Sequence, residues 1–402
     1  MIVRRFLLWA RHAPAADRAE AVGALARAFL DRELKPSDHA EAETALTAML
    51  DDPSTLVRRT MAENLAGSRH APRHVIVALA SDESEIAAPV LACSPVLDDS
   101  DLVDCAALGD ERAQVAIASR TALSPAVAAA LAEIAVAPAL LVLARNPGAD
   151  IAQFSLARMV ERHGKDGALC EALLARPGLP VEIAQTIAAT LAETFGAYAA
   201  GCGWLSAERS GRFTRDARER ATIALSAQIE TDEMARLVAH LRRSGQLNAA
   251  LILRAILSCG FDFAEAAFAD LSEQPLRRVA AILRDRRGGS FRALYGRTGM
   301  PETLRPAFEA ALSALLELGG EREGAGLSRR LVARVLAECA VMPTEVGGRL
   351  LALLRRFEVE AALEEARGAA DAMADDAALA IVLQHAPEEL LSGPVNSRLI
   401  AA

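Results

Sequence analysis

Aromatic residues are scarce in this chain, and lysine is almost absent. Only 4% of the 402 residues are aromatic although 52% are hydrophobic, and of the 44 basic residues only Lys35 and Lys165 are lysines. Sheets favour aromatic and β-branched residues, whereas alanine, which is abundant here, is the strongest helix former. The composition therefore predicts an all-α protein and excludes a wholly disordered one. We attribute the excess of arginine over lysine to genome composition and not to a binding design.

Motifs of known enzyme classes are missing as well. The chain has no phosphate-binding glycine loop, no GxSxG and no HExxH, and its six cysteines lie far apart without a CxxC pair. His70 and His74 flank Pro72, where a helix is expected to begin, so they do not form a zinc pair one helical turn apart. We therefore expect no enzymatic activity, no cofactor, no metal site and reduced thiols typical of a cytoplasmic protein.

Long apolar runs and an excess of positive charge are also lacking. The formal net charge of −9 argues against a protein that coats nucleic acids or membranes. Arg4 and Arg5 precede an apolar run, but that run ends at Ala10 and is too short for a signal peptide. The most apolar window, residues 121–143, is interrupted by Glu133 and Pro138, so we expect no membrane span.

What the sequence does contain is an internal repeat. Polar turns that lead into apolar runs begin near Asp51, Ser81, Gly109 and Arg145. A second set interleaves with them, with starts at Pro72, Asp99, Pro125 and Pro180, which are 27, 26 and 55 residues apart. Aspartate, serine and proline at these positions are typical of helix N-termini. The spacing predicts two short helices per repeat of about 27–30 residues, and such pairs must stack to bury their apolar faces.

Several stretches within these repeats resemble a known family. They are Val57-Arg58-Arg59 with Ala62-Glu63, Ala71-Pro72-Arg73-His74-Val75, residues 88–95, Arg145-Asn146-Pro147-Gly148-Ala149 and Arg176-Pro177-Gly178-Leu179-Pro180. They look like domain of unknown function 2336, an uncharacterised alphaproteobacterial family of HEAT-like helices. The resemblance covers residues 51–191 closely. It implies a helical-repeat fold in a bacterial cytoplasmic protein and brings no activity with it.

We expect a HEAT-like α-α solenoid followed by a second helical domain. The expected segments are N-terminal capping helices (1–50), the repeats (51–200), a second helical unit (201–320) and C-terminal helices with a tail (321–402). At least three stacked helix pairs are expected between Ala42 and Phe195, and three helices between Leu327 and about His385. The expected core of the repeats comprises Leu65, Val75, Leu79, Leu91, Leu102, Ile117, Leu131 and Leu143.

One segment stands out for its charge. Residues 277–297 contain seven arginines and one acid, Asp285, in a chain that is acidic overall. A glycine pair follows Arg286-Arg287, a helix is expected to begin near Ser290, and aromatic rings lie close by in sequence. Arginines around such a turn can bind an anion, and a ring can stack on a nucleotide. The candidate anion site comprises Arg284, Arg286, Arg287, Arg292, Arg297 and Tyr295. The alternative is an ordinary helical turn whose arginines pair with acids such as Asp270 or Glu273 and whose rings are core.

Three functional hypotheses follow. The first is a non-enzymatic scaffold or adaptor that binds a protein partner on the concave face of the solenoid. The second is a signalling module that responds to a nucleotide or other anion through residues 277–297. The third is a nucleic-acid-processing or lyase enzyme, which rests on analogy with other helical-repeat enzymes alone.

Overall fold

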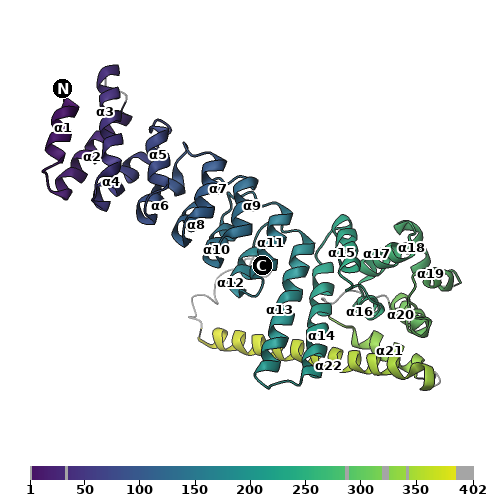
Figure 1. The fold of residues 1–402 in the computed structure, drawn as a ribbon. Coiled ribbons are helices and arrows are strands. Elements are labelled where there is room, and N and C mark those ends of the chain that lie inside the picture. The colour runs from purple at the N-terminus through teal and green to yellow at the C-terminus, as the bar shows by residue number, and fades with distance from the viewer. Residues whose placement is uncertain (1, 32–34, 286–288, 319–325, 341–343, 386–402) are drawn as a thin grey trace, which may run out of the picture. The chain divides into compact units, whose positions relative to one another are not determined.

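The computed structural model describes residues 2–31, 35–285, 289–318, 326–340 and 344–385. These residues form α-helices, two short 3₁₀ helices and one isolated bridge between Leu123 and Ala149, and the described part of the chain contains no sheet (Figure 1). The expectation of an all-α protein is confirmed. No helix in the described ranges is both long and apolar enough to cross a membrane.

The chain divides into two compact units, Met1–Thr214 and Arg215–Ala402, where the sequence suggested four segments. The boundary lies inside helix α14 (Ala207–Ser226), and the two halves of this helix have different partners. In the first half, the Ser210 hydroxyl donates to the Gly196 carbonyl oxygen at 2.6 Å. In the second half, Arg220 Nε donates to Glu360 Oε1 at 2.5 Å. A composition change near residue 201 therefore marks a turn between helices and not the limit of a unit.

Unit 1 consists of helices joined by short turns. Its elements are α1 (Ile2–Ala10), α2 (Ala15–Leu30), α3 (Pro36–Ala48), η1 (Met49–Asp51), α4 (Thr55–Leu65), α5 (Arg73–Ala80), α6 (Ser84–Cys93), α7 (Asp99–Leu108), α8 (Glu111–Ala118), α9 (Pro125–Ile134), α10 (Ala137–Arg145), α11 (Gln153–His163), α12 (Gly167–Leu174), α13 (Val181–Gly201) and the first half of α14. Side chains of Asp98, Asp110, Ser124 and Asp166 cap α7, α8, α9 and α12 by accepting from main-chain N–H groups.

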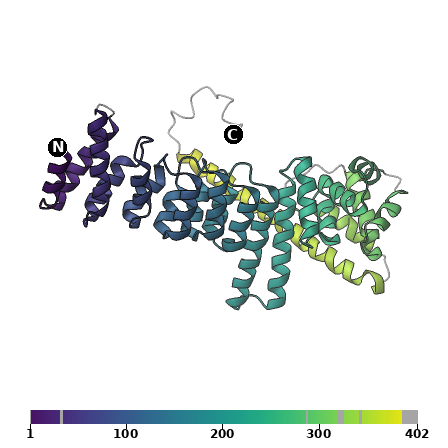
Figure 2. The ribbon, with the colours of Figure 1, turned by 45° about the horizontal axis from the view of Figure 1, so that its top comes forward.

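The helices of unit 1 form two layers. One layer contains α4, α6, α8, α10 and α12, each packed on the next, and the other contains α7, α9, α11 and α13. Helices α5 and α6, α7 and α8, and α9 and α10 also pack as successive pairs (Figure 2). We call the helices from α4 to α13 the array. Every second connection in the array lies on the same side of the layers, because alternate helices run in the same direction.

The register of the array corrects one detail of the sequence interpretation. Helices α5, α7, α9, α11 and α13 begin 26, 26, 28 and 28 residues apart. The turn at Arg145 therefore begins α11 and belongs to the same set as Pro125 and Pro180. This helix fills the 55-residue gap in that set.

The core of unit 1 is continuous along the array and consists of small and branched residues. All eight predicted core positions between Leu65 and Leu143 are at most 4% exposed. They belong to one buried cluster that extends from Ala10 to Ile187. Close burial of alanine between leucines explains why so few aromatic residues are needed here.

Unit 2 contains a different mixture of helices. Its elements after α14 are α15 (Thr231–Arg243), α16 (Ala249–Leu257), α17 (Phe261–Ser272), α18 (Leu276–Leu283), α19 (Phe291–Arg297), η2 (Glu302–Leu304), α20 (Arg305–Leu318), α21 (Arg329–Cys339) and α22 (Thr344–His385). Two described helices follow residue 326 where three were expected. The reason is that residues 344–385 contain no proline, so nothing interrupts α22.

Candidate functional site

The arginine-rich segment of unit 2 is where the sequence placed an anion site. Arg284, at the end of α18, donates from Nε to Glu265 Oε1 at 2.7 Å, and its guanidinium lies 5.5 Å from the centre of the Phe261 ring. Burial raises the pKa of Glu265, and the hydrogen bond from Arg284 opposes this shift. Arg284 therefore has a protein partner already. Arg286 and Arg287 lie outside the described residues.

Tyr295 belongs to the core of unit 2, which corrects its predicted place at a ligand site. The residue is 0% exposed, and its hydroxyl donates to the Pro301 carbonyl oxygen at 2.8 Å. Its ring packs against Phe268, Phe291 and Phe308 with centre distances of 5.5–6.5 Å. Burial raises the pKa of Tyr295 to about 12. No face of this ring or of the buried Phe291 is open to a stacked base.

The two remaining predicted arginines lie on α19. Arg292 and Arg297 are exposed, and they are five positions apart in a helix of seven residues. Five residues correspond to about 140° around a helix, so the two side chains leave it in different directions. The described part of this segment does not bring the predicted arginines together.

A different feature emerges on the array, along the side that carries its longer connections. Arg120, between α8 and α9, donates to the carbonyl oxygens of Leu91 and Ser94 at 2.8 and 2.7 Å. Asn146, between α10 and α11, donates from Nδ2 to the carbonyl oxygens of Ala118 and Arg120 at 2.8 and 2.7 Å. Each connection is thus tied to the one before it.

Arg176, between α12 and α13, extends this series by one repeat. It donates to the carbonyl oxygens of Ala144, Asn146 and Ala149, each at 2.9 Å. These oxygens lie at and beyond the end of α10, where main-chain acceptors have no partner within the helix. We call Arg120, Asn146 and Arg176 the loop ladder. Their spacings of 26 and 30 residues follow the repeat, which is the sequence signal that could have revealed them.

The α8–α9 and α10–α11 connections are also joined through their main chains. The Leu123 N–H donates to the Gly148 carbonyl oxygen, and the Asp150 N–H donates to the Leu123 carbonyl oxygen, both at 3.1 Å. A Cβ atom at Gly148 would lie 1.9 Å from the Thr121 carbonyl oxygen, so only glycine allows this approach. The loops on this side of the array therefore form a fixed surface.

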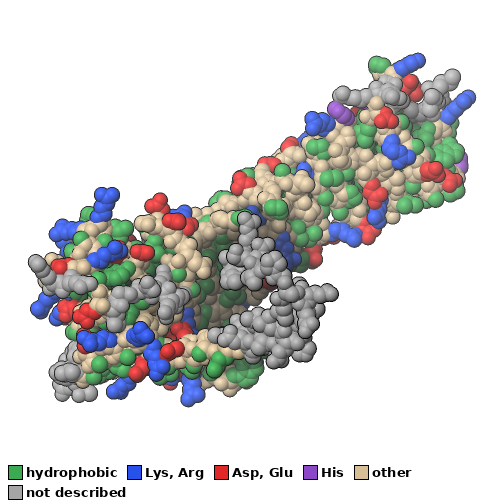
Figure 3. Space-filling view, turned by 180° about the vertical axis from the view of Figure 1, so that it is seen from behind, with side chains coloured by type: hydrophobic (Ala, Val, Ile, Leu, Met, Phe, Trp, Pro, Cys, Tyr) green, Lys and Arg blue, Asp and Glu red, His purple; other side chains and the backbone are tan. Residues whose placement is uncertain are grey.

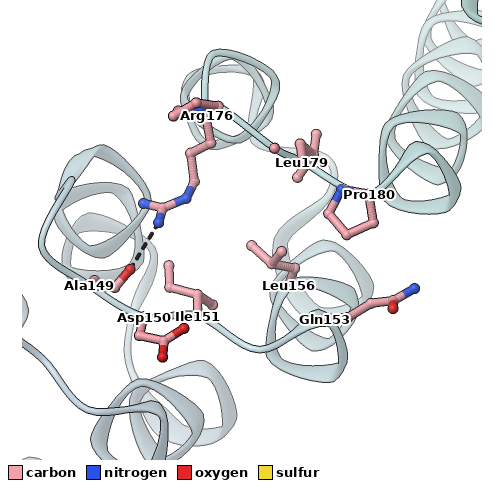
Figure 4. Close-up of a pocket in the computed structure, with 10 residues that line it drawn as sticks. Ala149, Asp150, Ile151, Gln153, Leu156, Arg176, Leu179 and Pro180 are labelled. Atoms are coloured by element: carbon pink, nitrogen blue, oxygen red, sulfur yellow. Dashed lines mark hydrogen bonds between the residues drawn. The ribbon is translucent and has the colours of Figure 1, made fainter. Parts of the chain in front are cut away.

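A small groove lies between the last two of these connections. Its lining comprises residues 149–151, Gln153, Leu156 and residues 176–180, and it encloses about 180 Å³. The side chains of Ile151, Leu156 and Leu179 point into it, whereas Gln153 points away (Figure 4). We call this site the α11–α13 groove. Sequence reasoning missed it because its walls come from two loops about 27 residues apart.

The electrostatics of the groove come from two residues. Burial lowers the pKa of Arg176, and its side-chain donors are directed to main-chain oxygens. Asp150, at the rim, is exposed. The accessible lining of the groove is therefore mostly polar, with the aliphatic side chains of Ile151, Leu156 and Leu179 beneath it and the Asp150 carboxylate at its edge, and its only lining arginine is already engaged.

Two further groups of polar residues have structural explanations. In unit 2, Arg254 is 2% exposed and donates to Glu360 Oε2 at 3.0 Å and to Glu219 Oε2 at 3.2 Å, with its guanidinium 4.7 Å from the Phe357 ring centre. Burial raises the pKa of Glu219. In unit 1, His74 shares a 2.8 Å hydrogen bond with Thr47. No cluster of three histidine, cysteine or acidic side chains that could hold a metal occurs among the described residues.

Charges of both signs are mixed on the outer surface. Figure 3 shows basic and acidic side chains side by side on the face in view, with apolar side chains between them. Several ion pairs join successive repeats of the array, such as Arg58 with Asp82 at 2.7 Å and Arg112 with Glu85 at 2.8 Å. These surface arginines thus join repeats to one another.

Comparison with known proteins adds a family and no activity. Neither a curated protein nor a solved structure matches the chain. A family model described as an uncharacterised protein conserved in bacteria, DUF2336, matches residues 86–345, which include most of the array and much of unit 2. The chain therefore belongs to the uncharacterised bacterial family DUF2336.

Proposed function

We propose that the protein is a non-enzymatic cytoplasmic adaptor whose HEAT-like array binds a protein partner. The observation that carries this proposal is the α11–α13 groove, which is small, has three aliphatic side chains directed into it (Figure 4), and is held by loops that are hydrogen-bonded to one another. We place the anchor of the contact there, on the side of the longer connections, and not on the concave face as a whole.

The size and lining of the groove favour a protein side chain over a substrate. Its 180 Å³ is smaller than the roughly 300–1,000 Å³ typical of small-molecule sites. Its lining contains no serine, threonine, cysteine, lysine or histidine. A groove of this kind suits one large apolar side chain from a partner, and such an anchor typically contributes much of the binding energy of an interface.

The negative charge at the rim of the groove indicates which charge the partner carries. Asp150 is exposed beside the aliphatic side chains of the groove, and the chain carries a formal charge of −9. An acidic surface steers basic partners and repels acidic ones. The expected ligand is a segment with one large apolar residue flanked by arginine or lysine.

The experiment compares two variants of the full chain in the native bacterium. Ile151→Asp places a charge in the groove, whereas Leu108→Asp changes a side chain that is 90% exposed at the end of α7. We expect the same partner to co-purify with the wild type and with Leu108→Asp and to be lost from Ile151→Asp. Equal recovery by all three proteins would contradict the groove, and substrate turnover by the purified chain would contradict the adaptor.

A second experiment distinguishes the adaptor proposal from the hypothesis of an anion-responsive signalling module. Arg284 pairs with Glu265 and Tyr295 is buried, so neither supports a nucleotide site. Calorimetric titration of ATP into the chain at low and high salt tests what remains of that hypothesis. Heat that falls with salt and disappears in the double variant Arg286→Ala, Arg287→Ala would favour it. We found no observation that favours the enzyme hypothesis.

A further inference from the structure

The turn between α13 and α14 carries an exposed group of aromatic side chains. Phe195, Tyr198, Trp204 and Phe213 are 53%, 58%, 67% and 41% exposed, and all four belong to unit 1. They include one of only two tryptophans and one of only two tyrosines in the chain. We call these four residues the hairpin face. Exposed apolar groups of this size on a soluble protein mark interaction surfaces.

The hairpin that presents these rings is tightly packed. Gly196 on α13 lies so close to α14 that a Cβ atom would be 2.1 Å from Thr214 Oγ1. The Ser210 hydroxyl on α14 donates to the Gly196 carbonyl oxygen at 2.6 Å. Figures 1 and 2 both show the two helices side by side. The rings are therefore carried by a rigid pair of helices and lose little freedom when they bind.

The four rings form two neighbouring pairs on the hairpin. Phe195 and Phe213 have ring centres 5.6 Å apart, and Tyr198 and Trp204 are also 5.6 Å apart in an edge-to-face arrangement. Phe195 and Tyr198 are three positions apart on α13 and so share a face of that helix. The hairpin thus presents one aromatic pair that spans the two helices and one that joins α13 to the turn.

Charge around the hairpin face narrows the choice of partner. Residues 194–207 contain no charged side chain in a chain that is 24% charged. The flanking residues Glu193, Glu208, Arg209 and Arg212 sum to zero. An anionic membrane attracts basic segments, and neither this balance nor the net charge of −9 provides one. A second copy of this surface would meet an apolar centre whose margins carry no net charge, so no net repulsion opposes the contact.

The exposed area of the four rings supplies a large part of what a dimer contact requires. The exposed parts of the four rings amount to about two whole aromatic side chains, or ~300–500 Å² per copy. Two copies would bury ~600–1,000 Å² from the rings alone, and neighbours such as Ala197 and Leu205 would add to it. Specific interfaces start at about 1,200 Å² in total.

We infer that the hairpin face is a homodimer interface. It packs against the same face of a second copy in a two-fold contact, in which four helices enclose eight aromatic rings. Two-fold dimers are the commonest oligomers because one self-complementary surface is sufficient. The groove lies elsewhere in unit 1, so this inference does not depend on the proposed adaptor function.

Sedimentation velocity of the full chain tests the inference. We expect a dimer at tens of micromolar, and we expect Tyr198→Glu and Phe213→Glu each to raise the dissociation constant about thirtyfold or more, as for a buried aromatic anchor. Leu108→Glu is the matched control and should remain dimeric. Circular dichroism identifies any variant that fails to fold, in which case Trp204→Ser replaces it.

A second readout follows the interface directly. In a Trp9→Phe background, the emission of Trp204 should shift to the blue as the concentration rises, because dimerisation removes the ring from water. A monomer at about 100 µM, or a dimer that persists in both glutamate variants, would overturn the inference. So would binding of the monomer to vesicles containing phosphatidylglycerol that is lost in the same variants, since that result would assign the rings to a lipid surface.

Discussion

Arg176 donates a hydrogen bond to the main-chain oxygen of Asn146 at 2.9 Å, and this links one repeat of the array to the next. Asn146 in turn donates from its side chain to the main-chain oxygen of Arg120 at 2.7 Å. The residues that fix the loops beside the groove are therefore bonded to backbone and not to acids.

Replacement of Arg176 tests the stabilising role of the loop ladder. Arg176→Met keeps much of the apolar stem but leaves several partly buried carbonyl oxygens without a donor, which typically costs about 1–3 kcal/mol. We expect urea unfolding followed by circular dichroism to show a loss of this size. Arg145→Met, an exposed arginine at the end of α10, is the control and should change stability by less than about 0.5 kcal/mol. Equal effects of the two substitutions would show that the ladder is not stabilising.

The packed core of the array gives a second prediction. Leu131 is 0% exposed, and Leu131→Ala should lower the free energy of unfolding by about 2–5 kcal/mol because it removes buried methyl groups and leaves a cavity. Leu108→Ala makes the same chemical change at a side chain that is 90% exposed and should have almost no effect. Chemical denaturation of both variants measures these changes in the free energy of unfolding. A loss well below about 2 kcal/mol for Leu131→Ala would mean that the layers are loosely packed.

The corrected place of Tyr295 is tested by titration. Its pKa of about 12 means that the folded state favours the neutral phenol, so the folded protein should lose stability as the pH rises above the ordinary tyrosine value of about 10. In a Tyr198→Phe variant, which leaves Tyr295 as the single tyrosine, absorbance should show ionisation only near pH 12 or on unfolding. Ionisation near pH 10 in the folded protein would show that Tyr295 is exposed to solvent and not buried in the core.

The N-terminus of α7 has its own dependence on pH. Asp98 accepts hydrogen bonds from the Ser100 hydroxyl at 2.6 Å and from the Asp101 N–H at 3.0 Å, and these bonds lower its pKa to about 2. The cap should therefore stabilise the fold fully above about pH 4 and lose its effect as the pH falls through 2. The difference in Tm between the wild type and Asp98→Ala should shrink over this range. A difference that stays constant down to pH 2 would contradict the assignment.

Much of unit 1 is predictable because its signals are local. Proline, serine and aspartate before apolar runs mark helix starts through capping, and the eight predicted core positions are all buried. The register of the repeats was harder to predict. The turn at Arg145 resembles in composition the turns at Asp51, Ser81 and Gly109, although it belongs with those at Pro125 and Pro180. Only the packing of α11 between α9 and α13 shows where it belongs.

The candidate site was not predictable for two physical reasons. The acceptors of Arg120, Asn146 and Arg176 are main-chain oxygens, which every residue possesses, so the sequence shows only the regular spacing of the donors and not what they bind. Burial also cannot be assigned to a ring from its neighbours in sequence. Tyr295 lies among arginines and is buried, whereas Trp204 lies among small apolar residues and is exposed.

Site-specific photocrosslinking in the native bacterium tests the adaptor proposal most directly. A photoreactive phenylalanine analogue is placed at Pro177, an exposed residue of the groove lining, and in a matched strain at Leu108. We predict that illumination joins one protein partner to position 177, that the adduct maps to a large apolar residue flanked by basic residues, and that position 108 gives no such adduct. Absence of a protein adduct at position 177, or the same adducts at both positions, would contradict the account.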